Sequence, residues 1–127
     1  MADVRFGIMG MGRGRKASEE ILGADGATLA CVCDLREDKA KEKGEEFGCD
    51  WTTDYQAMFA RDDIDAIGVY TSSGTHCQYA IEVMEAGKHA FVTKPMDITV
   101  EACDAAIAKA EETGKILAVD FGNRYGV

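Results

Sequence analysis

Three glycines near the amino terminus, and a carboxylate that follows them, have the types and spacing that hold a dinucleotide. Gly10-Met11-Gly12-Arg13-Gly14 directly follows the apolar run 4–9, and Asp34 closes the next apolar run, 29–33. Glycines let a backbone approach a pyrophosphate, whose charge is met by the N–H groups and positive dipole end of the next helix. A carboxylate at the end of the second strand can accept hydrogen bonds from the adenine-side ribose.

The glycine pattern is irregular at its third position. The usual spacing places a third glycine at residue 15, which is Arg15 here, and Gly14 stands one place early. We therefore expect a turn that is one residue shorter than usual. Arg15 has two interpretations of equal weight: a charged contact to the bound cofactor, or a solvated arginine on the helix surface.

Apolar runs and amphipathic stretches alternate along the chain, which predicts an α/β fold with a doubly wound parallel sheet, a Rossmann dinucleotide-binding fold. We expect strands at 4–9, 28–33, 50–52, 66–71, 89–92 and 116–120, and helices at 13–22, 37–47, 54–60, 76–86 and 99–112. With 127 residues, no repeat and no linker, the chain is predicted to be one domain, residues 1–127.

Two finer features of the helices also follow from local patterns. The Thr-x-x-Gln sequences at 53–56 and 75–78 predict capping boxes. Val100, Cys103, Ile107 and Ala110 recur at helical spacing and predict the apolar face of the last helix.

Residues able to bind or react follow nearly every strand of the predicted sheet. Because ligands of an open parallel sheet bind outside the carboxyl ends of its strands, these residues are expected to meet at one edge. They are Gly10 and Gly12 after the first strand, Asp34 after the second, Thr71 to His76 after the strand at 66–71, Lys94 and Pro95 after the strand at 89–92, and Asn123 and Arg124 after the last.

Composition excludes several classes of partner. Fourteen basic and 23 acidic residues give a net charge of −9, which argues against nucleic acid and against anionic membrane surfaces. No apolar stretch approaches membrane-spanning length, and the expected compartment is the cytoplasm. The five cysteines lack paired metal-ligand spacing, so we expect no metal site and interpret Cys31 and Cys33 as buried small hydrophobes.

The ordered set of motifs resembles the glucose–fructose oxidoreductase/inositol dehydrogenase (Gfo/Idh/MocA) family over essentially the whole chain. The motifs that carry the resemblance are Gly7 to Arg13, Val32-Cys33-Asp34, Thr71 to His76, Glu85 to His89 and Thr93-Lys94-Pro95-Met96. The sequence departs from the family pattern at Thr93, where the family has glutamate, and at Ser72 and Ser73, where Pro-Asn is frequent.

The resemblance implies the N-terminal domain of an NAD(P)-dependent oxidoreductase that transfers hydride to or from sugars, polyols, cyclitols and related small molecules. It implies that Lys94 is catalytic, beside the nicotinamide and substrate. The implied cofactor-binding residues are Gly10, Met11, Gly12, Arg13, Gly14, Asp34, Arg36, Thr71, Ser72, Ser73, His76, Lys94 and Pro95. For His76, cofactor contact and packing at the helix start are equally weighted.

The choice between NAD and NADP can also be argued from the residues. Asp34 favours NAD, because a carboxylate repels the 2′-phosphate of NADP, whereas Arg36 offers that phosphate a partner or stacks on adenine.

The family's C-terminal α/β catalytic domain is absent from this chain, so we expect weak nucleotide binding, no turnover by these residues alone, and an oligomer only as a possibility. The alternative is a stand-alone NAD(P)-binding sensing or regulatory module, and the reading frame past Val127 distinguishes the two.

Overall fold

Strands and helices alternate through the computed structural model, which describes residues 3–71, 75–93 and 99–120. The elements are β1 (Val4–Met9), α1 (Gly14–Leu22), β2 (Ala27–Cys33), α2 (Glu37–Phe47), β3 (Asp50–Thr52), α3 (Tyr55–Phe59), β4 (Ala66–Val69), α4 (His76–Glu85), β5 (His89–Thr93), α5 (Val100–Thr113) and β6 (Leu117–Asp120). Every strand and helix that the sequence pattern predicts is present, and no bound differs from the predicted one by more than two residues.

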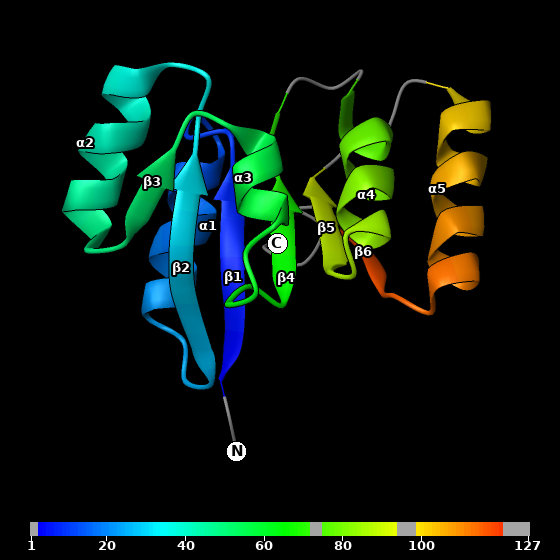
Figure 1. The fold of residues 1–127 in the computed structure, drawn as a ribbon, viewed down its shortest axis with the longest axis horizontal. Coiled ribbons are helices and arrows are strands. Elements are labelled where there is room, and N and C mark those ends of the chain that lie inside the picture. The colour runs from blue at the N-terminus through cyan, green and yellow to red at the C-terminus, as the bar shows by residue number, and fades with distance from the viewer. Residues whose placement is uncertain (1–2, 72–74, 94–98, 121–127) are drawn as a thin grey trace, which may run out of the picture.

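The six strands form one parallel sheet in the order β3-β2-β1-β4-β5-β6. Strand order reverses at β1, since the chain moves outward through β2 and β3 and then returns to add β4 on the other side of β1. The predicted doubly wound fold is therefore confirmed. All strands run in one direction, so their carboxyl ends meet at the upper edge in Figure 1.

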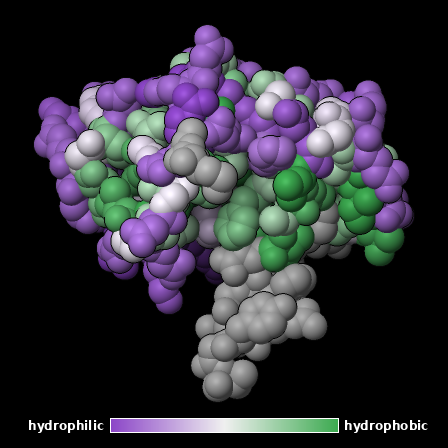
Figure 2. All heavy atoms as spheres, turned by 90° about the horizontal axis from the view of Figure 1, so that it is seen from below, coloured by the Kyte–Doolittle hydropathy of each residue, from purple (hydrophilic) through white to green (hydrophobic). Residues whose placement is uncertain are grey.

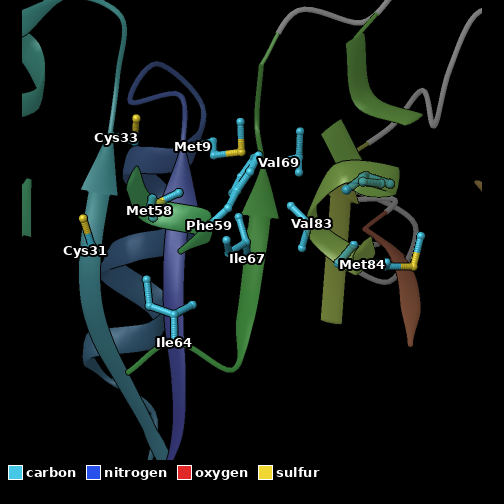
Figure 3. Close-up of a cluster of buried hydrophobic side chains, with 13 residues drawn as sticks. Met9, Cys31, Cys33, Met58, Phe59, Ile64, Ile67, Val69, Val83 and Met84 are labelled. Carbon is cyan, nitrogen blue, oxygen red and sulfur yellow. The ribbon is translucent and has the colours of Figure 1, made fainter. Parts of the chain in front are cut away.

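Helices cover the two faces of the sheet unequally. Side chains from α3 and α4, including Phe59 and Val83, pack with Met9 and Ile67 on one face (Figure 3). On the other face a smaller cluster of buried side chains, which includes Ile8 and Val32, packs against residues of α1 and α2. Alternation along β1 places its neighbouring apolar residues in opposite clusters, as expected for a strand buried on both faces.

A buried lysine fastens the loop before β4 to the start of β5. Lys88 is 7% exposed, and its ammonium Nζ donates to the backbone carbonyls of Arg61 and Ile64, the latter at 3.1 Å. A buried cation is costly unless it is hydrogen-bonded, and these two carbonyls supply the partners. The contact lies at the amino-terminal ends of the strands, away from the edge where ligands are expected.

Apolar side chains are exposed at that amino-terminal edge of the sheet. Val4, Leu22 and Ile116 are 44%, 51% and 64% exposed. Figure 2 shows this side of the molecule, with hydrophobic residues lying among hydrophilic ones. No helix within the described ranges is long and apolar enough to cross a membrane.

Two local expectations are wrong. At α3, Asp54 is the N-cap and accepts from the Gln56 N–H, because it stands one residue closer to the helix than Thr53. At α4, Thr75 is the N-cap but its side chain makes no capping hydrogen bond; its hydroxyl lies 2.8 Å from the Thr71 hydroxyl instead.

The expected apolar face of α5 is only partly buried. Val100 and Ile107 are 72% and 47% exposed, whereas Ala106 is fully buried. The helix packs through its small side chains, so Ala110 contacts the core and the larger aliphatic residues remain outside.

Candidate functional site

The first glycine of the turn is required by the backbone geometry. Gly10 has a φ of +88°, and a Cβ there would lie 2.5 Å from the Tyr70 carbonyl oxygen. Its N–H donates to the Cys33 carbonyl at 2.7 Å. The turn is therefore held against the ends of both β2 and β4, and a side chain at position 10 has no room.

Gly14 is the glycine at which α1 packs closely against β1, a role for which the irregular motif left no clear residue. A Cβ at Gly14 would lie 2.6 Å from Ile8 Cγ2 and 3.3 Å from Met11 Cε, so this glycine lets α1 approach β1 closely. Arg15, the next residue, is exposed and pairs with Glu19 at 3.4 Å on the helix surface. The structure thus favours the solvated interpretation of Arg15.

Gly12 and Arg13 lie on the open side of the same turn. A Cβ at Gly12 would meet nothing within 4 Å, and Arg13 is the exposed N-cap residue of α1. The first N–H groups of a helix lack intrahelical partners and carry its positive partial charge. A phosphate group placed here would meet both a side-chain-free backbone and a favourable dipole.

Asp34 links the end of β2 to the glycine turn. Its Oδ2 accepts the Met11 N–H at 2.8 Å and its Oδ1 accepts the Arg36 N–H at 2.9 Å. An ionised carboxylate has about four acceptor positions, so roughly two remain for ribose hydroxyls. The carboxylate is partly exposed, which leaves those positions accessible.

The Arg36 side chain, at the N-cap of α2, pairs with a carboxylate in the first turn of that helix. Its guanidinium pairs with Asp38 at 3.3 Å, and the two side chains are 68% and 74% exposed. An exposed pair of this kind contributes at most about 1 kcal/mol. Such a pair offers little resistance if Arg36 turns toward a phosphate.

His76 supports the loop after β4 from inside the protein. It is 1% exposed, and its Nε2 lies 2.8 Å from the Thr71 carbonyl oxygen. The Thr71 and Thr75 hydroxyls form a second bridge across the same loop, at 2.8 Å. These contacts favour the packing interpretation of His76, and they hold Thr71 at the carboxyl end of β4.

A cleft of about 320 Å³ opens where these groups meet. It brings together five residues expected from the sequence, Gly10, Gly12, Asp34, Thr71 and Thr75. It also contains four that sequence reasoning missed: Leu35, Tyr55, Tyr70 and Tyr79. Their types and spacing carried no signal, because they come from separate elements and only the fold places them together.

The remaining expected site residues divide into two groups. Met11 is buried and contributes its backbone N–H to Asp34, as described above. Ser72, Ser73, Lys94 and Pro95, and the Asn123-Arg124 pair, lie outside the described residues.

A second hollow, of about 310 Å³, lies between α1 and the sheet. Its lining is mostly apolar and includes Phe6, Ile21 and Phe91. No residue of the glycine turn lines it. The cleft at the carboxyl edge, with its hydrogen-bonding groups, is therefore the candidate site.

Two of the cysteines, Cys31 and Cys33, lie in the core of the protein. Cys31 and Cys33 are fully buried, which confirms their interpretation as small core residues, and burial raises the pKa of Cys31 to about 11. Among the described residues, no group of three His, Cys, Asp or Glu side chains is placed to hold a metal ion.

Comparison with known proteins agrees with this geometry. Residues 4–121 match a family model described as an oxidoreductase family with an NAD-binding Rossmann fold. The chain is 34% identical, over 96% of its length, to the scyllo-inositol 2-dehydrogenase (NAD(+)) of Bacillus subtilis, and 36% identical, over 99%, to the alpha-N-acetylgalactosaminidase of Shewanella oneidensis. It spans only 36% and 30% of those two proteins.

The fold is also similar to that of a solved structure determined with a dinucleotide bound. The WlbA dehydrogenase of Chromobacterium violaceum, in complex with NADH and UDP-GlcNAcA, superimposes with a TM-score of 0.91 at 31% identity. The match covers 98% of this chain and 37% of that one.

Proposed function

The chain belongs to the Gfo/Idh/MocA oxidoreductase family through its NAD-binding Rossmann domain, and from this premise we propose that it supplies the cofactor site of a hydride-transferring enzyme. The substrate class is a sugar, polyol or cyclitol-like alcohol or its ketone. The observation that carries the proposal is the single cleft in which the glycine turn, Asp34 and Thr71 meet. When bound, the dinucleotide supplies the nicotinamide ring that accepts or donates hydride.

The residues of the cleft bind and orient the cofactor. The open backbone at Gly12 and the amino end of α1 meet the pyrophosphate, and Asp34 accepts the adenine-side ribose hydroxyls with its remaining lone pairs. His76 acts through Thr71, whose position at the end of β4 it maintains. We propose that further contacts to the cofactor come from Ser72, Ser73 and Pro95.

Lys94 is proposed to stand beside the nicotinamide and the substrate. It is the next residue after β5, which pairs with β4 and ends at the same sheet edge. A lysine ammonium there would donate a hydrogen bond to the substrate oxygen and hold the proton that moves with the hydride.

NAD is the proposed cofactor in preference to NADP. A 2′-phosphate would occupy the place where Asp34 accepts hydrogen bonds, and two negative groups within a few ångström repel each other. Arg36 supports the alternative, because its exposed pair with Asp38 is weak enough to be exchanged for a 2′-phosphate.

The substrate and the complete activity are proposed only as a class. Relatives named as a dehydrogenase and as a glycosidase match this chain almost equally well, and each is far longer than 127 residues. Residues 1–127 are proposed to form one cofactor domain, with the groups that choose the substrate on further chain. These residues alone are then expected to bind the cofactor and to turn nothing over.

Titration of the chain with NADH and NADPH tests the proposal. NADH should bind more tightly, and Asp34→Asn should weaken NADH by about tenfold through loss of charge-assisted hydrogen bonds. Asp25→Asn removes an equal charge from an exposed loop outside the cleft and should change nothing. Failure of both nucleotides to bind overturns the proposal, and tighter NADPH binding overturns the cofactor preference.

A further inference from the structure

The carboxylate of Asp34 bonds to the glycine turn itself, a contact that binding of a ribose does not require. Its Oδ2 accepts the Met11 N–H at 2.8 Å, and its Oδ1 accepts the Arg36 N–H at 2.9 Å. Met11 lies within the turn, and Arg36 is the N-cap residue of α2. One side chain therefore ties the turn after β1 to the start of the helix after β2.

The backbone of the turn at Met11 is fixed by three kinds of contact. The preceding Gly10 N–H donates to the Cys33 carbonyl at 2.7 Å. The Met11 side chain is 1% exposed and packs in the buried cluster on the α1 side of the sheet. The third contact is the hydrogen bond from the Met11 N–H to Asp34. Only this third contact can be removed by a substitution outside the core and outside the turn.

The next two N–H groups of the turn are left for a ligand. Within the described part of the chain, the N–H groups of Gly12 and Arg13 donate to no other group. Both residues are exposed, and a Cβ at Gly12 would meet nothing within 4 Å. Met11 joins the peptide group that Asp34 holds to the peptide group that carries the Gly12 N–H. Because peptide groups are planar and rigid, fixing Met11 also sets the direction of the Gly12 N–H.

We propose that Asp34 is a positioning residue for the pyrophosphate: by holding the Met11 N–H, it aims the N–H groups of Gly12 and Arg13 at the phosphate oxygens. The inference rests on the proposed function, since it gives a second role to a residue of that cofactor site.

This role has the opposite consequence to that of the Asp34 charge. A carboxylate repels a pyrophosphate, so on charge alone its removal should tighten pyrophosphate binding. If Asp34 positions the turn, its removal weakens the binding of pyrophosphate, even when the ligand has no ribose.

The test uses inorganic pyrophosphate, which has neither a ribose nor a base. It is titrated into the isotope-labelled chain at constant ionic strength and followed by NMR. Asp34→Ala should bind pyrophosphate about fivefold more weakly than the unchanged chain, which is the effect of about one hydrogen bond. The folded fraction of each chain is measured in the same spectra, so that only folded protein enters the dissociation constant.

Asp38→Asn is the matched control for charge. Asp38 lies in the first turn of α2, is 74% exposed and pairs with Arg36, so its substitution removes one negative charge near the same sheet edge without touching the glycine turn. This variant should bind pyrophosphate as tightly as the unchanged chain, or more tightly. An equal loss of affinity in both variants would overturn the positioning role, because the loss would then not come from the contact with Met11.

The unchanged chain gives a second measurement that needs no variant. Pyrophosphate should shift the amide signals of Gly12 and Arg13 most, and that of Met11 less, since the Met11 N–H stays on Asp34. A largest shift at Met11 would overturn the inference, because the ligand would then have taken this N–H from the carboxylate.

The remaining outcomes separate the inference from the proposed function. An Asp34→Ala chain that binds pyrophosphate as tightly as the unchanged chain, or more tightly, overturns the positioning role and leaves Asp34 as a partner of the ribose alone. Binding of NADH without binding of pyrophosphate by the unchanged chain has the same meaning. Failure of the unchanged chain to bind either ligand overturns the proposed function, and the positioning role with it.

Discussion

The three glycines of the turn do different work, and alanine substitutions should separate stability from binding. Gly14→Ala introduces a methyl group 2.6 Å from Ile8 Cγ2, far inside van der Waals contact. Gly12→Ala introduces one with nothing within 4 Å. We therefore expect the first to destabilise the fold and the second to leave the fold intact and weaken NADH.

The loss of stability in Gly14→Ala depends on how far the Ile8 side chain can move away from the new methyl group. Ile8 is 1% exposed, and its Cγ2 branches from Cβ, so rotation about χ1 cannot remove the clash without moving the rest of the side chain. Overpacking of this kind costs about 1–3 kcal/mol, and the better helix propensity of alanine returns at most about 1 kcal/mol at the first position of α1. The middles of these two ranges, about 2 and about 0.5 kcal/mol, leave a net loss of about 1.5 kcal/mol, or roughly 4–8 °C in Tm for a domain of this size.

Urea denaturation followed by circular dichroism measures the free energy of unfolding, and NADH titration measures binding. The free energy of unfolding of the Gly12→Ala chain should lie within about 0.5 kcal/mol of that of the unchanged chain. Its NADH binding should be at least tenfold weaker, which is a loss of about 1.4 kcal/mol in binding free energy. A Gly14→Ala chain as stable as the unchanged one would refute the assignment of Gly14 as the close-packing glycine. A Gly12→Ala chain with full NADH affinity would refute the approach of the pyrophosphate to that position.

Three further outcomes are expected. Lys88→Met should lower the free energy of unfolding by about 1–3 kcal/mol in the same urea assay, because it leaves two backbone carbonyls unpaired; a neutral result would show that water replaces the ammonium. Arg5 lowers the pKa of Asp65 from 3.8 to about 2, so the pair stabilises the fold above pH 4 and is lost as pH falls toward 2. Asp65→Asn should make the free energy of unfolding depend less on pH between 4 and 2, by a small amount since the pair is exposed, and an unchanged acid profile would contradict this. Cys31 and Cys33 should resist a thiol reagent at pH 8 until urea is added, because they are buried and the pKa of Cys31 is about 11; labelling of the native chain, read by mass spectrometry, would refute their burial.

Much of the fold could be predicted because its signals are local. A continuous apolar run such as the one at β4 is typical of a strand buried on both faces, and glycine after a helical pattern predicts the end of the helix. Gly48 and Gly114 do end α2 and α5 in the left-handed conformation. Local signals fail where two neighbouring residues compete, as when Asp54 rather than Thr53 caps α3.

Part of the candidate site could be predicted for a topological reason. Residues that follow parallel strands share one edge of the sheet whatever their side chains do, so Gly10, Asp34 and Thr71 could be assigned to one cleft before their contacts were known. The orientation of His76 could not, because it depends on a hydrogen bond to the Thr71 carbonyl inside the loop.

The sequence by itself determined the order of strands and helices, the parallel sheet, and the edge at which a glycine turn and a carboxylate meet, because periodicity and chain connectivity are written residue by residue. Only the tertiary structure decided that Gly14 is the glycine that brings α1 against β1, and that Leu35, Tyr55 and Tyr79 line the same cleft as Asp34. Those facts are distances between separate elements. They are set by how the side chains pack once the sheet has formed, and no spacing along the chain records them.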